Sequence, residues 1–370
     1  MRVVMFYHSL LSDWNHGNAH FVRGVAGELL SRGHHVDVYE PADAWSVRRL
    51  VEEHGEEAIA RFHSAYPDLR SHRYDPDAFD VDGAVARADL VLVHEWNHPA
   101  LVARVGAACA ARPSTRLLFH DTHHRSVSDQ QALAGVDLTD YDGVLAYGRV
   151  IRDRYLSEGW ARRAWTWHEA ADVTVFRPRR DQPLEGDLVW IGNWDDDERA
   201  EEIEEFLIEP VARLRLSATV YGVRYPPRAL QALARAGIRY RGWLPNFEVP
   251  QVFGRYRVTV HVPRRPYTQA LPGIPTIRPF EALACAIPLV SAPWDDVERL
   301  FDVGQDFLMA ADGDEMAERL AALIAHPADA ALMAARGLRA IRARHTCAHR
   351  VDELLAIHSE LQGQRGAVEA

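Results

Sequence analysis

Short apolar runs alternate with longer amphipathic stretches along the first half of the chain. Runs of this length, rich in Val, Ile and Leu and separated by helical patterns, are typical of buried strands in a parallel sheet with helices on both faces. The strand candidates are residues 2–8, 35–40, 89–94, 116–120, 142–147 and 164–168. The first half is therefore predicted to form a doubly wound α/β domain.

The pattern is interrupted over residues 171–186, which carry two prolines and a cluster of charges, and it then starts again. Such a segment is typical of an interdomain linker. Further strand candidates follow at 187–193, 218–223, 238–244, 258–263, 287–293 and 306–311. We predict an N-terminal domain over 1–170, a C-terminal domain over 187–346, and a terminal helix and tail over 347–370. The predicted fold class is α/β, with two Rossmann-like domains that face a central cleft.

Polar residues follow each apolar strand of the first half. His94 and Glu95 come after one strand, and His120 and Asp121 come after the next. In open α/β sheets the ligand crevice lies outside the carboxyl ends of the strands. If the chain is an enzyme that must deprotonate its substrate, Asp121, Glu95 and His120 are the candidates for the general base.

Residues 94–98, HEWNH, match the zinc-peptidase signature H-E-x-x-H. That motif binds zinc only on a helix, where both histidines share one face. Pro99 pushes His98 away from helical geometry and suits the first position of a following helix, so we predict no zinc here. One short loop contains four further possible metal ligands, His120, Asp121, His123 and His124. Side chains so closely spaced in one loop do not close a tetrahedral site. We therefore predict no metal.

The amino-acid composition argues against several classes of function. The 370 residues carry a formal charge of −11, which argues against broad binding of nucleic acid or anionic membranes. The chain has no lysine, so Schiff-base chemistry and a Walker phosphate loop are excluded. Three distant cysteines, no apparent signal peptide and no long apolar run predict a cytoplasmic protein without an integral membrane segment.

Two segments have the form of anion-binding helix starts. The loop LPGIPT, residues 271–276, leads into a predicted helix whose N–H groups and dipole suit a diphosphate. Glu281 lies one turn inside that helix and is expected to be partly exposed; its carboxylate would either accept hydrogen bonds from a ribose diol or complement the helix dipole. Gly17 and Asn18 precede another helix, where glycine permits either close approach of a ligand or an ordinary turn.

These segments together resemble the GT-B glycosyltransferases of the glycogen-phosphorylase and retaining-transferase superfamily. They resemble most the bacterial transferases similar to spore-maturation glycosyltransferases, over roughly residues 1–350. The residues that carry the resemblance are HGNAHFVRGVAGELLSRGHHVDVYEP, LVLVHEWNHP, LLFHDTHHR, AADVTVFRP and FEALACAIPLVSAPW.

The resemblance implies roles for individual residues. Gly17 matches the glycine loop near the donor diphosphate, and Asn18 adjoins it. His120 matches the histidine that contacts the transferred sugar, and Glu281 matches the glutamate that binds the donor ribose. The loop and helix start over 273–278 match the segment that holds the donor phosphates, which includes Gly273, Thr276 and Arg278.

Two departures leave the mechanism open. Relatives carry a second glutamate eight positions before Glu281, and this chain has Gly273 there, so the donor sugar and the retaining or inverting outcome are undetermined. Relatives also use an Arg and a Lys after the first strand of the second domain, where this chain reads IGNWDDDERAEE. Arg264, Arg265 and Arg278 are the candidates for neutralising the diphosphate, and Asn193 is a further donor-site candidate.

We therefore expect a metal-independent glycosyltransferase of the hexosyltransferase type. A nucleotide sugar would be its co-substrate, with no separate cofactor, and the acceptor would be a small molecule or a glycan bound by the N-terminal domain. No nucleic-acid partner is expected, and a homodimer is left open. Two alternatives remain: a nucleotide-sugar epimerase or hydrolase on the same fold, and a non-catalytic partner subunit that binds nucleotide sugar.

Overall fold

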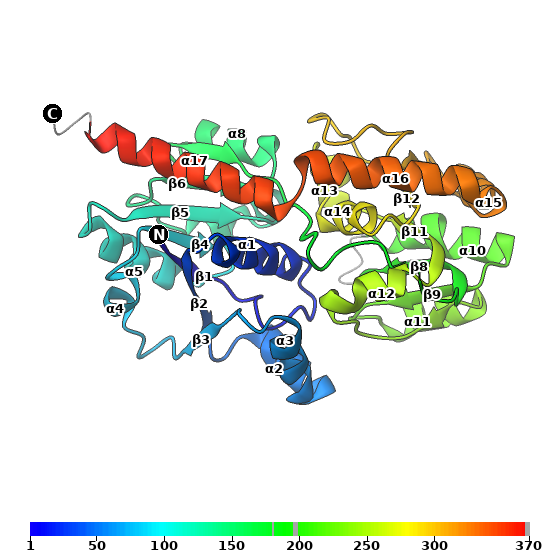
Figure 1. Cartoon of the computed structure of the whole chain (residues 1–370), viewed down its shortest axis with the longest axis horizontal. Helices are drawn as coiled ribbons and strands as arrows, with labels where there is room; N and C mark the ends of the chain where they lie inside the picture. Colours follow the sequence, from blue (N-terminus) through cyan, green and yellow to red (C-terminus); the bar gives the residue numbers. More distant parts are fainter. Residues whose placement is uncertain (180, 195–198, 367–370) are drawn as a thin grey trace. The chain divides into compact units, whose positions relative to one another are not determined.

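The chain folds into two compact α/β units in a computed structural model that describes residues 1–179, 181–194 and 199–366. The first unit comprises Met1–Glu169 together with Cys347–Ala370, and the second comprises Ala170–Thr346. Helix α17 (Cys347–Gly366) therefore joins the N-terminal unit, although the whole second unit separates it from the rest of that unit in the sequence (Figure 1).

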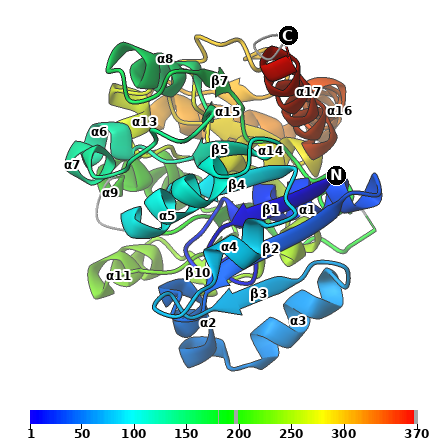
Figure 2. The ribbon, with the colours of Figure 1, turned by 90° about the vertical axis from the view of Figure 1, so that its left-hand side faces the viewer.

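The first unit is built on a parallel sheet with strand order β3-β2-β1-β4-β5-β6-β7 (Figure 2). All six strands predicted for this half are present, and β4 at the centre of the sheet is buried along its whole length. The sequence pattern missed β3, because this edge strand reads SHRY and only its last residue is buried. The strand bounds are β1 Arg2–Phe6, β2 His35–Pro41, β3 Ser71–Tyr74, β4 Leu90–His94, β5 Arg116–Asp121, β6 Gly143–Ala146 and β7 Ala164–Thr166.

Helices of the first unit pack their apolar sides on this sheet. Helix α17 lies beside α1, where Arg32 at the end of α1 donates to Asp352 over 2.6 Å and to the Ala348 carbonyl. Gly33, at φ +82°, turns the chain out of α1 towards β2. The bounds are α1 Ala19–Ser31, α2 Trp45–His54, α3 Glu57–Ala65, α4 Val81–Val85, α5 Pro99–Ala110, α6 Arg125–Ser128, α7 Gln130–Ala134 and α8 Arg149–Ser157.

The second unit has its own parallel sheet, in the order β10-β9-β8-β11-β12-β13. Its strands coincide with predicted runs but are shorter; β10, predicted over 238–244, ends at Tyr240 because the chain turns at Gly242, with φ +73°. The bounds are β8 Gly186–Ile191, β9 Ala218–Tyr221, β10 Arg239–Tyr240, β11 Tyr256–His261, β12 Leu289–Ser291 and β13 Leu308–Met309.

Helices surround this second sheet, and a core that includes Trp190, Leu207 and Leu320 lies beneath them. The first part of the predicted linker is folded into this unit: Ala171 bridges to Thr346, and Asp172 caps the turn at Thr174. The bounds are α9 Ala200–Ile203, π-helix η1 Glu204–Ile208, α10 Glu209–Leu214, α11 Pro227–Arg235, 3-10 helix η2 Asn246–Glu248, α12 Val249–Phe253, α13 Arg265–Gln269, α14 Ile277–Ala284, α15 Gly313–Ala325 and α16 Pro327–Arg344.

The predicted fold class, two Rossmann-like units with parallel sheets, is confirmed. In both sheets the strand order reverses beside the first strand of the unit, at β1 and β4 in the first and at β8 and β11 in the second. Ligands of such folds bind outside the carboxyl ends of strands at this switch point. Across the described residues, no helix has both the length and the apolar character needed to cross a membrane.

Candidate functional site

The HEWNH segment lies at the end of a strand, as its sequence context predicted. His94 is the last residue of β4, and His98 has extended geometry (φ −61°, ψ 136°) as the N-cap of α5. The His98 Nδ1 atom accepts from the Ala100 N–H at 3.2 Å, and Pro99 is the first residue of the helix. The helix that the zinc-peptidase motif requires is therefore absent at these residues, which the structure describes throughout. Among the described residues, no three His, Cys, Asp or Glu side chains form a group that suits a metal ion.

Metal analysis provides a direct test of this segment. We expect the purified full-length protein to contain no stoichiometric zinc, and EDTA to leave both its melting temperature and its activity unchanged. One zinc per chain that is lost in a His94→Ala, His98→Ala double variant would contradict this prediction.

Four residues identified from the sequence meet at the carboxyl ends of β4 and β5. Glu95 accepts from the Thr122 N–H at 2.9 Å through Oε1, and Asp121 accepts from the Tyr155 hydroxyl at 2.8 Å through Oδ2. Thr122 Oγ1 lies 2.9 Å from His94 Nε2, which is also 3.0 Å from the side-chain amide of Asn18. The start of α1 is therefore tied to the ends of the two central strands.

Glu95 and Asp121 form a buried pair of carboxyl groups. Both are at most 1% exposed, and this burial raises the pKa of Asp121 to about 6. Burial also raises the pKa of Glu95 well above its usual value, and the neighbouring charge of Asp121 raises it further. Like charges this close disfavour double ionisation, so the pair retains a proton at pH values where isolated carboxyl groups have lost theirs.

His120 is enclosed by aromatic rings. Its Nδ1 hydrogen-bonds the Tyr7 hydroxyl at 2.7 Å, and its ring centroid lies 4.8 Å from that of Trp167 and 5.8 Å from that of Phe21. Burial lowers the pKa of His120 to about 3, so its ring is neutral at physiological pH. Within the described residues, the Nε2 atom of His120 has no hydrogen-bond partner.

A pH titration of stability tests the carboxyl pair. Because the pKa of Asp121 is raised in the folded state, the folded chain keeps a proton that the unfolded chain loses, from about pH 4 to about pH 6. The contribution of the Asp121 carboxyl group to the unfolding free energy is therefore fully present below pH 4 and is lost as the pH rises through 6. We expect Asp121→Asn, which cannot ionise, to gain up to about 3 kcal/mol in unfolding free energy relative to wild type between pH 4 and pH 8.

The measurement is urea denaturation of both proteins across that pH range. Asp68→Asn, an exchange at an exposed carboxylate in the same unit, is the control and should show no such pH-dependent gain. A difference between Asp121→Asn and wild type that is constant with pH would contradict a raised pKa.

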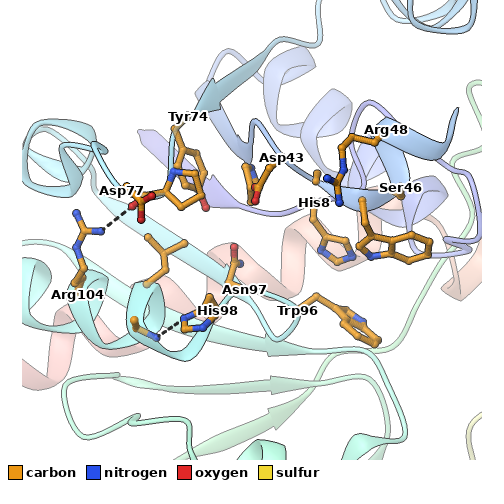
Figure 3. A pocket seen from close by; sticks show the side chains of 16 residues that line it. His8, Asp43, Ser46, Arg48, Tyr74, Asp77, Trp96, Asn97, His98 and Arg104 are labelled. Carbon is orange, nitrogen blue, oxygen red and sulfur yellow. Dashed lines mark hydrogen bonds between the residues drawn. The ribbon is translucent and has the colours of Figure 1, made fainter. Parts of the chain in front are cut away.

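The cavity of the first unit lies beside this cluster. It has a volume of about 840 Å³, and its lining comes from the segments that follow β1, β2, β3 and β4 (Figure 3). Glu95, His120 and Asp121 are not among the lining residues, and their side chains are closed within the unit. His8, Trp96 and Asn97 do line it.

His8 is the titratable group that the sequence analysis did not single out. It follows β1 as Glu95 follows β4, so its position at a strand end was the available signal. The ring is 8% exposed, and burial and the neighbouring His16 lower its pKa well below the usual value. Neither ring nitrogen of His8 has a hydrogen-bond partner within the described part of the chain. His8 is therefore a neutral imidazole at the wall of a cavity, able both to donate and to accept a hydrogen bond.

The predicted glycine turn precedes α1. Gly17 is exposed, and its carbonyl accepts from the His20 N–H at 3.3 Å. Asn18 is the N-cap of α1, but its side-chain amide is directed to His94, and it makes no cap hydrogen bond within the described residues. The Ala19 N–H also donates to the His16 carbonyl at 3.4 Å, so backbone carbonyls already occupy the first two N–H groups of this helix.

In the second unit, Glu281 is fully buried, so the expectation of partial exposure was wrong. Its Oε1 accepts from the Asn246 side-chain amide at 2.7 Å, and its Oε2 pairs with the guanidinium of Arg278. The sequence could not indicate this, because α14 is covered on nearly every side: Ile277 and all residues from Pro279 to Ala284 are buried.

The loop before α14 carries strained backbone. Thr276, the N-cap, has φ +59° and ψ −175°, a conformation that β-branched residues rarely adopt. Its side chain caps no N–H group within the described residues, so the first turn of α14 keeps donors for a ligand. Strain of this kind gathers at ligand-binding segments.

Gly273 has a structural reason to lack a side chain. Its φ is +92°, and its N–H donates to the Asp295 carbonyl at 2.7 Å. A Cβ atom added to Gly273 would lie 2.8 Å from Cγ of Glu298 and 2.9 Å from its Oε1. The carboxylate of Glu298 therefore occupies the space next to Gly273 that a glutamate side chain would need.

The ends of β8 and β11 are joined by an arginine that the sequence analysis passed over. Arg199 donates to the Asn193 carbonyl at 2.6 Å and to the Val262 carbonyl at 2.9 Å, and its guanidinium lies 5.2 Å from the Trp190 ring centroid. Asn193 Oδ1 accepts from the Val223 N–H at 2.9 Å. Residues 195–198, the most acidic part of this segment, lie outside the described residues.

The three arginines proposed for charge neutralisation differ in their surroundings. Arg265 pairs with Glu202 at 2.7 Å and Glu201 at 2.8 Å, so its charge is largely balanced inside the unit. Arg278 is balanced by Glu281. Arg264 is half-buried at the N-cap of α13, shortly after the end of β11 at His261.

Comparison with known proteins supports the resemblance found in the sequence. Residues 199–356 match the family model described as glycosyl transferase-like. No curated protein matches the chain. Its fold is similar to sucrose-phosphate synthase of Thermosynechococcus elongatus, with a TM-score of 0.66 at 15% identity, covering 98% of this chain and 100% of the other.

Two further solved structures have the same arrangement of elements. HepE of Anabaena, in complex with UDP and glucose, has a TM-score of 0.68 at 14% identity and covers 97% of this chain and 100% of its own. An alpha-glucosyltransferase in complex with UDP and a DNA 13-mer that contains an HMU base has a TM-score of 0.69 at 13% identity and covers 97% of this chain and 99% of its own. The predicted resemblance to GT-B glycosyltransferases is thus confirmed.

Proposed function

We propose that this protein transfers a sugar from a nucleotide-sugar donor to an acceptor, without a metal. The observation that carries the proposal is the segment from Gly273 to Glu281, in which a strained loop with uncapped N–H groups begins a buried helix inside a glycosyltransferase-like family segment. The solved neighbours HepE and alpha-glucosyltransferase are complexes with UDP, which makes UDP-glucose the first donor to test.

On the donor side, the start of α14 would bind the diphosphate through backbone N–H groups, and Glu281 would accept hydrogen bonds from the ribose. A carboxylate already held by Asn246 and Arg278 retains further lone pairs and needs no reorganisation when a ligand arrives. Gly17 and Asn18 in the first unit, and Asn193, Arg264 and Thr276 in the second, are the other donor-site residues we propose.

Glu298 is a candidate for the carboxylate that is missing at position 273. It lies against Gly273, the position that matches the second glutamate of the relatives in sequence. We propose that Glu298 faces the donor sugar in its stead.

On the acceptor side, the cavity of the first unit would hold the acceptor. Glu95, His120 and Asp121 remain candidates for the chemistry, but they do not line the cavity, which favours positioning of the β4 and β5 ends over direct contact with the acceptor. His8 lines the cavity, is neutral and has unsatisfied ring nitrogens, so it is our candidate for the general base of an inverting reaction.

A panel of nucleotide sugars tests the proposal. Thermal shift and calorimetry should identify a donor that the full-length protein binds, and transfer of radiolabel from that donor to a mixture of acceptors should follow, with EDTA present. Conversion of the donor with no acceptor added would instead support an epimerase or hydrolase. Binding of donor without turnover across a broad set of acceptors would support a non-catalytic partner subunit.

A further inference from the structure

We propose that the cavity of the first unit binds a neutral glycoside, a sugar-bearing molecule without phosphate or carboxylate groups. The role of this glycoside as the acceptor rests on the proposed function. Its binding in the cavity does not depend on that function. The volume of about 840 Å³ falls within the range of small-molecule sites.

Unsatisfied polar groups around the cavity indicate the ligand's chemistry. His8, Ser46 and Asn97 are 8%, 1% and 6% exposed, and all three line the cavity. Within the described residues, both His8 ring nitrogens, Ser46 Oγ and Asn97 Oδ1 have no hydrogen-bond partner. A buried polar atom left without a partner is costly, and at the wall of a cavity a bound molecule can supply the missing hydrogen bond.

The unsatisfied groups include both donors and acceptors. A neutral imidazole offers one N–H and one lone pair, and a serine hydroxyl can both donate and accept. The Asn97 amide oxygen is an acceptor, and the amide nitrogen is already used as a donor to the carbonyls of Phe6 and His94. A hydroxyl group matches each of these, since it donates one hydrogen bond and accepts others. Several adjacent hydroxyls on one small molecule are the pattern of a sugar.

The charges at the cavity do not favour an anion. Two carboxylates, of Asp43 and Asp77, and two guanidiniums, of Arg48 and Arg104, line the cavity, so their formal charges sum to zero. The guanidinium of Arg104 already donates to backbone carbonyls, to that of Phe79 at 2.6 Å and to that of Pro76 at 3.4 Å. A phosphate group would therefore find no excess of positive charge here.

Two exposed indole rings complete the site. Trp45 and Trp96 line the cavity and are 40% and 42% exposed. In Figure 3, His8, Ser46 and Trp96 lie at one end of the cavity, and Tyr74, Asp77 and Arg104 lie at the other. The C–H bonds on one face of a pyranose ring carry partial positive charge and pack well on the negative face of an indole. Aromatic rings beside hydroxyl-binding groups thus suit a sugar ring better than a purely apolar ligand.

Saturation-transfer NMR and calorimetry on the full-length protein without donor test this inference. The probes are methyl hexosides, pentosides and deoxyhexosides with the disaccharides cellobiose and maltose, against glucose 6-phosphate, inorganic phosphate and 4-nitrophenol. We expect at least one neutral glycoside to bind and to receive saturation from tryptophan protons. Failure of every neutral glycoside, or tighter binding of a phosphate-bearing probe or of 4-nitrophenol, would overturn the inference.

Two variants place the bound glycoside in the cavity. Trp96→Ala should weaken its binding about 3- to 10-fold through the loss of aromatic packing, and Ser46→Ala about 2- to 10-fold through the loss of one hydrogen bond. Ser46→Ala should also leave the melting temperature unchanged or raised, since it removes an unsatisfied hydroxyl, so it remains informative if Trp96→Ala folds poorly. Leu332→Ala, at a residue 60% exposed on α16, is the control and should have no effect on binding.

The outcomes separate this inference from the proposed function. Binding of a neutral glycoside that both variants weaken, without sugar transfer, would support the site and count against the transferase. Sugar transfer to an acceptor whose binding neither variant affects would support the transferase and count against the glycoside site in the cavity.

Discussion

Replacing His8 with alanine is expected to lower the rate of sugar transfer by about 10²- to 10⁴-fold, the usual contribution of a general base. The ring lines the cavity of the first unit, is neutral because burial and His16 lower its pKa, and has nitrogens free of hydrogen bonds to the described residues. A neutral imidazole nitrogen has a lone pair that can take the proton of an acceptor hydroxyl, although a lowered pKa weakens it as a base. Donor binding should not change, because His8 is not one of the residues proposed for the donor site.

The measurement is single-turnover transfer from a radiolabelled donor, with the anomeric configuration of the product assigned by NMR. His35→Ala is a matched control, since His35 is exposed at the amino end of β2, the opposite edge of the sheet from the cavity. Asp121→Asn and Glu95→Gln should reduce transfer less than His8→Ala if these groups only position the strand ends. A product of retained configuration, formed by His8→Ala at the wild-type rate, would contradict the role of His8.

Replacing Glu281 with glutamine is expected to weaken nucleotide binding by about 1.5–3 kcal/mol, the contribution of hydrogen bonds to a charged group. The neutral amide still fills the same space and its oxygen can accept from the Asn246 amide, so the fold should be retained. Glu281→Ala should be more severe: it leaves the buried amide of Asn246 and the guanidinium of Arg278 without their partner, at a cost of about 1–3 kcal/mol in unfolding free energy.

Calorimetry with UDP and with the donor identified in the panel, together with urea denaturation, separates these two effects. Glu209→Gln, an exchange at an exposed glutamate in the first turn of α10, is the control and should change neither quantity. If Glu281→Gln binds nucleotide as tightly as wild type, Glu281 is only a structural partner of Asn246 and Arg278 and is not part of the donor site.

The sequence by itself determined the two sheets and the positions of most of their strands. A buried parallel strand such as Leu90–His94 is apolar on both faces, so its run of letters reveals it without knowledge of its neighbours. The polar residues that follow β4 and β5 were also evident, and parallel strands bring their carboxyl ends to one edge. That is why Glu95 and Asp121, 26 positions apart in the sequence, were correctly expected near each other.

Only the tertiary structure decided which of these side chains are accessible. His120 and Asp121 end β5 and His8 follows β1 of the same sheet. Yet His120 and Asp121 are enclosed by Tyr7, Trp167 and Tyr155, while His8 lines a cavity. Likewise, the burial of Glu281 and the approach of Glu298 to Gly273 depend on segments distant in sequence. The hydrophobic periodicity of an element shows which of its faces is buried, because that periodicity arises from local backbone geometry. The residues that cover this face, and the cavities left between them, depend on packing between elements, which local sequence patterns do not encode.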